Sequence, residues 1–104
     1  KEKYDKAWGT LGLVGKHVYR LRALADENSV LCWLAQGGVE AYINLSDPPK
    51  WHDIAPGLLI AKEAGSVITD ANENKIHSEK VESLVVANNS EIHTNLIQII
   101  KSND

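Results

Sequence analysis

Residues 51–70 read WHDIAPGLLIAKEAGSVITD and contain the pattern of one helix followed by one strand. Asp53 is a residue type that can cap a helix, and Pro56 is tolerated in a first turn, where its missing N–H has no intrahelical partner. Gly65 ends the helix, and residues 66–69 continue as a short strand. A stripe of apolar residues predicts the buried side of the helix: Leu58, Leu59, Ala61 and Ala64.

Similar helix and strand patterns alternate along the rest of the chain. Residues 84–87 are apolar and partly β-branched, as in a strand that is covered on both faces. Further helices are expected at residues 3–14, 26–35 and 90–100, and further strands at residues 17–22 and 39–44. Because strands alternate with helices, the sequence predicts an α/β layered domain with a mixed, partly parallel sheet flanked by helices.

Composition limits the function classes open to this chain. Its 104 residues, 43% hydrophobic and 24% charged, suffice for one compact domain, residues 1–104. The net charge of -3 gives no general electrostatic reason to bind nucleic acid or an anionic membrane, and no apolar run is long enough to span a bilayer. A single cysteine, Cys32, cannot form an intramolecular disulfide, which favours a cytoplasmic location. The chain contains no methionine, so we expect it to be a piece of a longer protein.

Asp53 is the residue whose position most clearly indicates a chemical function. Its carboxylate stands at the expected start of a helix, after a loop at residues 45–50 that two prolines stiffen. A carboxylate held in this way can direct an oxygen toward a hard cation such as Mg²⁺. Asp is also a common N-cap residue, so a purely structural role explains the same position.

Three segments of the chain match one family pattern in register over about residues 18–100. Residues 51–70 carry Trp, Asp, Ala, Pro and Gly, then an apolar helix ending in Glu-Ala-Gly and a strand ending in Asp. Residues 22–44 (RALADENSVLCWLAQGGVEAYIN) hold an Arg, a helix and a strand with Ala-Tyr, and residues 83–100 (SLVVANNSEIHTNLIQII) a closing strand and helix. Together these segments resemble the C-terminal half of the inositol monophosphatase family.

The resemblance implies a Mg²⁺-dependent phosphomonoesterase of the sugar-phosphatase superfamily. In that family the Asp of the signature is a ligand of a catalytic metal, and the matching residue here is Asp53. The other metal ligands of the family come from its N-terminal half, whose acidic motifs are absent from this sequence. One carboxylate does not hold Mg²⁺ tightly, so we expect residues 1–104 alone to be catalytically inactive.

Three departures from the family pattern concern the substrate side of the site. His52 stands where the family usually has Trp, and it can orient Asp53, contact substrate or simply pack at the surface. Asp26 occupies a helix start where family members often have Ser. Asn44 falls near an acidic residue that contacts substrate hydroxyls in the inositol-specific members. We expect Asp26, Asn44 and His52 to be substrate-binding residues, with inositol phosphate as one candidate among small sugar and nucleotide phosphates.

Two functions follow from this resemblance. The first is the C-terminal portion of a phosphatase, whose missing N-terminal half docks on an exposed apolar surface that Trp8 and Trp51 help to line. The alternative is a non-catalytic binding or oligomerisation module, for example a homodimer, derived from the same fold. The expected partners are a small phosphorylated substrate and the N-terminal half, without nucleic acid or membrane.

Overall fold

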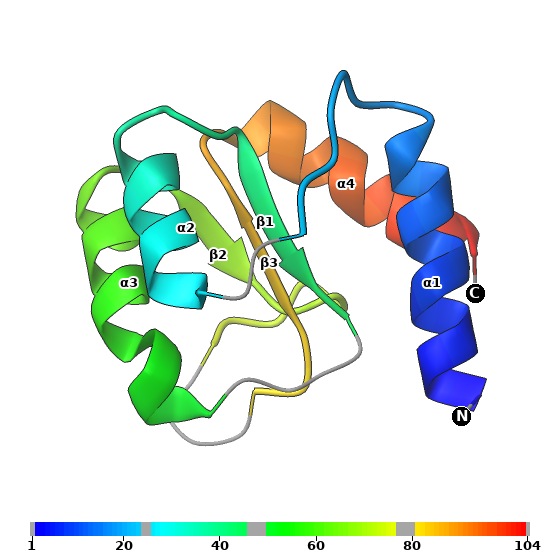
Figure 1. Cartoon of the computed structure of the whole chain (residues 1–104), viewed down its shortest axis with the longest axis horizontal. Coiled ribbons are helices and arrows are strands. Elements are labelled where there is room, and N and C mark those ends of the chain that lie inside the picture. The colour runs from blue at the N-terminus through cyan, green and yellow to red at the C-terminus, as the bar shows by residue number, and fades with distance from the viewer. Residues whose placement is uncertain (1, 24–25, 46–49, 77–80, 104) are drawn as a thin grey trace.

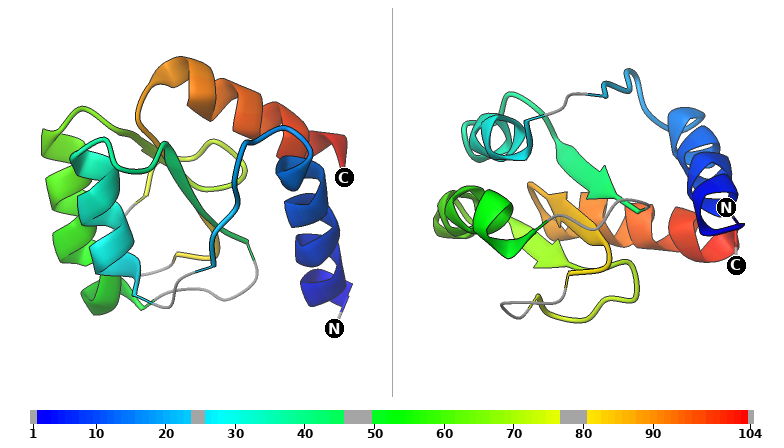
Figure 2. Two further views of the ribbon diagram at one scale, coloured as in Figure 1. Left: turned by 45° about the horizontal axis from the view of Figure 1, so that its top comes forward. Right: turned by 60° about the horizontal axis from the view of Figure 1, so that its bottom comes forward.

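The computed structural model describes residues 2–23, 26–45, 50–76 and 81–103. Within these residues the elements follow in the order α1 (Glu2–Gly15), α2 (Glu27–Ala35), β1 (Ala41–Asn44), α3 (Trp51–Glu63), β2 (Val67–Thr69), β3 (Leu84–Ala87) and α4 (Ser90–Ser102). Helices α2 and α3 cover one face of the sheet, and α4 lies on the other face with α1 beside it (Figure 1 and Figure 2). The expected α/β layered arrangement is therefore confirmed.

The sheet differs from the expected one in its strand pairing. Its order is β1-β3-β2, and β3 pairs antiparallel with both neighbours. Strands β1 and β2 run in the same direction and α3 connects them, as in a parallel βαβ unit, but β3 lies between them. Among the described residues no strand pair is parallel, so the prediction of a partly parallel sheet is wrong for this part of the chain. The alternation of helix and strand predicts the connection but not the insertion of a later strand.

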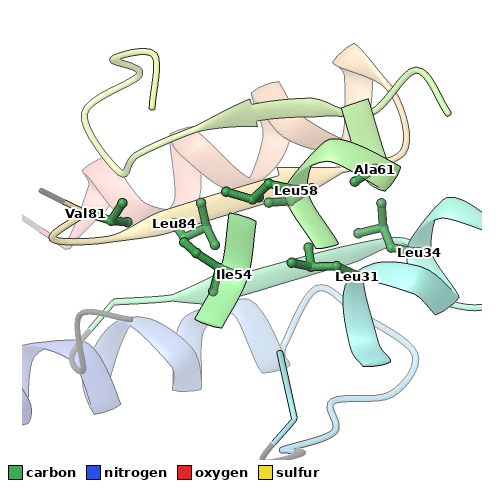
Figure 3. Close-up of a cluster of buried hydrophobic side chains, with 8 residues drawn as sticks. Leu31, Leu34, Ile54, Leu58, Ala61, Val81 and Leu84 are labelled. Atoms are coloured by element: carbon green, nitrogen blue, oxygen red, sulfur yellow. The ribbon is translucent and has the colours of Figure 1, made fainter. Parts of the chain in front are cut away.

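Strand β3 is buried along its whole length, as the apolar run predicts. Leu84 and Val86 face α2 and α3, where they join the first core cluster with Leu31 and Ile54 (Figure 3). Val85 points to the opposite face and packs with residues of α1 and α4. Each such fully buried aliphatic side chain contributes about 1.5–3 kcal/mol to stability, so one short strand supports both cores.

The strand expected at residues 17–22 does not form. These residues are irregular and exposed, with Tyr19 96% and Leu21 55% accessible to solvent. The guanidinium of Arg20 instead lies 5.5 Å from the centre of the Tyr19 ring. Alternating apolar residues form a strand only where a neighbouring strand accepts their hydrogen bonds and a core covers one face. Neither condition is met here among the described residues.

Helix α3 begins earlier than the sequence suggests. Its N-cap is Lys50, so Asp53 lies in the first turn instead of capping the helix, and Pro56 is the sixth helical residue. Ile54, Gly57, Leu58 and Ala61 form its buried side, whereas Leu59 is 60% exposed and Ala64 is also exposed. The proline-containing loop before α3 includes residues 46–49, which lie outside the described residues.

Gly57 sets how closely α2 approaches α3. A Cβ atom at this position would lie 2.8 Å from Cδ1 of Leu31 and 2.7 Å from Oδ1 of Asn28, closer than van der Waals contact allows. The glycine therefore lets the backbone of α3 rest directly against side chains of α2.

We predict that Gly57→Ala lowers the free energy of unfolding by about 1–3 kcal/mol, because the added methyl group overpacks this contact. Gly12→Ala is the control, since Gly12 is exposed in α1 and its Cβ would meet nothing within 4 Å. That change should stabilise the protein by about 0.5–1 kcal/mol through helix propensity. Urea unfolding of both variants measures the contrast, and equal effects of the two changes would contradict it.

A buried histidine joins α4 to the end of β2. The hydroxyl of Thr69 donates to the Asp70 carbonyl at 2.8 Å, so it accepts from Nε2 of His93, 2.7 Å away. Burial lowers the pKa of His93 below its ordinary value of 6.5, and the nearby Glu73 carboxylate opposes this shift. The neutral ring is therefore the form that the folded state favours.

Because the pKa of His93 is lower in the folded than in the unfolded state, the unfolded chain binds more protons below pH 6.5. The contribution of His93 is complete above that pH and is lost as the pH falls through the folded-state pKa. We predict that the free energy of unfolding decreases from about pH 7 to about pH 5, and that His93→Gln flattens this decrease. Chemical unfolding across that range provides the measurement, and identical slopes for the two proteins would exclude this role.

Candidate functional site

The candidate site lies at one end of the fold, where two helices begin and one strand ends. Helices α2 and α3 run side by side in the same direction, so their first turns lie at the same end (Figure 1). Strand β1 runs toward that end and finishes there at Asn44. Asp26, the N-cap of α2, and Asp53, in the first turn of α3, therefore share this end with Asn44.

Asp53 presents its carboxylate to solvent from the first turn of α3. Its backbone N–H donates to the Lys50 carbonyl at 2.9 Å, and its side chain is 56% exposed. The N-terminal end of a helix carries partial positive charge, which favours a carboxylate at this place. The position therefore holds an anionic oxygen donor that remains accessible to a cation.

His52 lies beside Asp53 at the start of α3. Its Nε2 lies 3.4 Å from Oδ1 of Asp53, and its side chain is 78% exposed. A contact this exposed adds little to stability.

Asp26 is the N-cap of α2, as the sequence predicts. Its carboxylate accepts from the Ser29 N–H at 3.4 Å and from the Ser29 hydroxyl at 2.8 Å. These two hydrogen bonds to Ser29 lower the pKa of Asp26. The carboxylate thus stays ionised and its orientation is set by α2.

Asn44 ends β1 with a half-buried side chain. Its Nδ2 atom donates to the Tyr42 hydroxyl at 3.4 Å. Asn44 and Asp26 therefore place one amide and one carboxylate at the same end of the fold as Asp53.

The described residues do not form a metal site by themselves. No group of three or more His, Cys, Asp or Glu side chains that could hold a metal ion occurs among residues 2–23, 26–45, 50–76 and 81–103. Mg²⁺ takes oxygen ligands and is often bound through one or two carboxylates together with water and phosphate. The carboxylate of Asp53 has the chemistry of one such ligand, and a magnesium site here would need further oxygen ligands.

The contact between Asn28 and Gly57 was not foreseen from the sequence. Oδ1 of Asn28 accepts a hydrogen bond from the backbone N–H of Gly57 at 3.0 Å, across 29 residues of chain. A glycine inside an apolar helix, directly after a proline, is a signal of close backbone approach. That signal predicts a contact at Gly57 but does not name the partner.

Comparison with known proteins assigns the family. Residues 4–104 match the inositol monophosphatase family. The chain belongs to this family. The fold agrees, since a hypothetical Pyrococcus horikoshii protein with similarities to inositol-1 monophosphatase superposes with a TM-score of 0.77 and 28% identity, over 84% of this chain and 37% of that one.

Relatives within the inositol monophosphatase family are phosphatases. A bifunctional NADP phosphatase/NAD kinase of Methanococcus maripaludis is 32% identical over 77% of this chain and 15% of its own length. A fructose-1,6-bisphosphatase/inositol-1-monophosphatase of Methanothermobacter thermautotrophicus is 31% identical over 81% of this chain and 31% of its own length. The chain thus spans less than two fifths of each of these proteins. None of the helices in its described part is long and apolar enough to cross a membrane.

Proposed function

We propose that this chain is the C-terminal portion of a Mg²⁺-dependent phosphatase that hydrolyses a small phosphomonoester. The observation that carries the proposal is the exposed carboxylate of Asp53 in the first turn of α3. The family resemblance matches this residue to an Asp that binds a catalytic metal. The same end of the fold holds Asp26 and Asn44, the two other polar side chains expected on the substrate side.

Each residue has a distinct task in the proposed reaction. Bound Mg²⁺ supplies the positive charge that activates water and stabilises the phosphoryl oxygens. Asp53 provides one oxygen ligand, and His52 restrains that carboxylate through the 3.4 Å contact. Asn44 and the ionised Asp26 offer hydrogen-bonding groups to the hydroxyls of a substrate. Catalysis of this kind depends on position, since a misplacement of about 1 Å costs on the order of 100-fold in rate.

The rest of the site comes, in this proposal, from a preceding part of a longer protein. Three large apolar side chains of α2 and α3 are exposed, namely Trp33, Leu59 and Ile60. We call these three residues the outer apolar patch and propose that another part of the protein covers them, because exposed large apolar side chains often mark an interaction surface. Trp8 is also exposed, whereas Trp51 is half-buried against the first core cluster and is less available for docking.

The substrate class rests on the relatives. Their names give NADP, fructose 1,6-bisphosphate and inositol 1-phosphate as substrates. These substrates share a phosphate ester on a polyhydroxylated carrier. We propose inositol phosphate or a related sugar or nucleotide phosphate as substrate, hydrolysed in the cytoplasm.

A binding or oligomerisation module is the second candidate, and α1 provides the observation that favours it. Tyr4 and Trp8 form an edge-to-face pair with ring centres 6.1 Å apart, and both side chains are more than half exposed. Exposed aromatic pairs are common anchors of protein interfaces. In this reading the chain forms homodimers through α1 and performs no catalysis.

We predict that Asp53→Asn, in the longer protein, lowers phosphate release from sugar phosphates by at least about 100-fold at saturating Mg²⁺, because the neutral amide is a poor ligand for a hard cation. Residues 1–104 alone should release no phosphate. Asp5→Asn, which removes an exposed carboxylate from the first turn of α1, is the control and should keep full activity. Full activity of Asp53→Asn would refute the metal-ligand role, and turnover by residues 1–104 would refute the need for further ligands.

Leu59→Ser tests whether the outer apolar patch is covered in the longer protein. It should lower the free energy of unfolding there by about 1.5–3 kcal/mol, the range for an aliphatic side chain that is fully buried. In residues 1–104 alone, where Leu59 is 60% exposed, the change should have little effect. Tyr19→Ser, at a position that is 96% exposed, should affect neither protein. Equal effects of Leu59→Ser in both proteins would argue against docking at the patch.

A further inference from the structure

Asn28 links the two helices whose first turns meet at the candidate site. It lies in the first turn of α2, two residues after Asp26, and its side chain is half-buried between α2 and α3. Its Oδ1 atom accepts the Gly57 N–H at 3.0 Å. Hydrogen bonds from the backbone of one helix to a side chain of another are uncommon, because an α-helix normally satisfies its own N–H groups.

The hydrogen bond between Asn28 and Gly57 requires a glycine at position 57. Any side chain at position 57 would place its Cβ 2.7 Å from Oδ1 of Asn28, so only glycine allows the approach. Leu31, one turn later on α2, packs at the same place with its side chain fully buried. The amide of Asn28 therefore joins α2 to α3 at a point of close backbone contact.

The first turn of α3 depends on such outside contacts more than most helix starts do. Pro56 has no N–H, so the His52 carbonyl cannot receive the usual hydrogen bond from the residue four positions later. Lys50, the N-cap, makes no side-chain capping hydrogen bond. Ile54, which is fully buried in the cluster that contains Leu31, and the Asn28 contact at Gly57 both tie this part of α3 to α2.

We propose that Asn28 is a positioning residue for Asp53: its hydrogen bond to Gly57 holds the proline-interrupted first half of α3 so that the Asp53 carboxylate keeps a fixed place relative to α2. This inference rests on the proposed function of Asp53 as a metal ligand. Asn28 touches neither metal nor substrate. It acts through the backbone of α3, and it ties the carboxylate of Asp53 to the helix that carries Asp26.

The test compares three variants of the longer protein. Asn28→Leu keeps the size of the side chain but removes the acceptor. Asn28→Asp retains an acceptor oxygen, and its charge is tolerated in the first turn of a helix. Asn103→Leu is the matched control: the Asn103 amide joins α1 to α4 by donating to the Thr10 hydroxyl at 2.8 Å, on the opposite face of the sheet.

Three readouts separate positioning from general stability. They are the Mg²⁺ concentration for half-maximal phosphate release, the affinity for Mn²⁺ measured by calorimetry without substrate, and the hydrogen-exchange rate of the Gly57 amide. For Asn28→Leu we expect a rise of about tenfold in the Mg²⁺ requirement, a matching loss of Mn²⁺ affinity and faster exchange at Gly57. Asn28→Asp should restore all three to within about threefold of the original protein. Asn103→Leu should lower the melting temperature without changing the metal requirement.

The outcomes distinguish failure of this inference from failure of the proposed function. If Asp53→Asn abolishes activity while Asn28→Leu and Asn103→Leu share an unchanged Mg²⁺ requirement, Asn28 is not a positioning residue. The same conclusion holds if Asn28→Asp fails to restore metal affinity although it slows exchange at Gly57. If Asp53→Asn leaves activity and Mn²⁺ affinity intact, the proposed metal ligand is wrong, and the inference about Asn28 falls with it.

Discussion

The burial of β3 on both faces is the constraint on which the rest of the structure depends. Four consecutive apolar residues leave this strand without a solvent side, so each face requires its own layer of helices. Leu84 and Val86 anchor α2 and α3, and Val85 anchors the α1 and α4 side. The site is a consequence of the first layer, since α2 and α3 pack side by side on one face of the sheet. They run in the same direction because each precedes one of two strands, β1 and β2, that themselves run in the same direction.

Within that layer, small local features decide where the polar groups lie. Gly57 allows α3 to approach α2 closely, and Asp26 caps α2 at the same end. Because both helices begin there, the positive ends of two helix dipoles and the end of β1 converge on one region. A region with this electrostatic character suits carboxylates and phosphates, which agrees with membership of a phosphatase family.

The sequence predicted the elements well where a pattern is local. The chemistry of single residues and the periodicity of the sequence predict three features that the structure has. They are the cap of α2 by Asp26, the burial of residues 84–87 and the last helix, α4. Strand pairing was not predictable in this way, because the insertion of β3 between β1 and β2 depends on contacts 16 to 46 residues apart along the chain. The prediction of a strand at residues 17–22 was wrong for the same reason: the alternating pattern says nothing about whether a partner strand is present.

The strand order also has a consequence for how the chain is made. In the part of the chain that the structure describes, β1 and β2 do not pair with each other, and each pairs with β3. During synthesis from the N-terminus, the ladder therefore cannot begin until residues 84–87 have left the ribosome. Until then the apolar residues of α2 and α3 have no finished sheet to cover, so these side chains stay exposed on the nascent polypeptide.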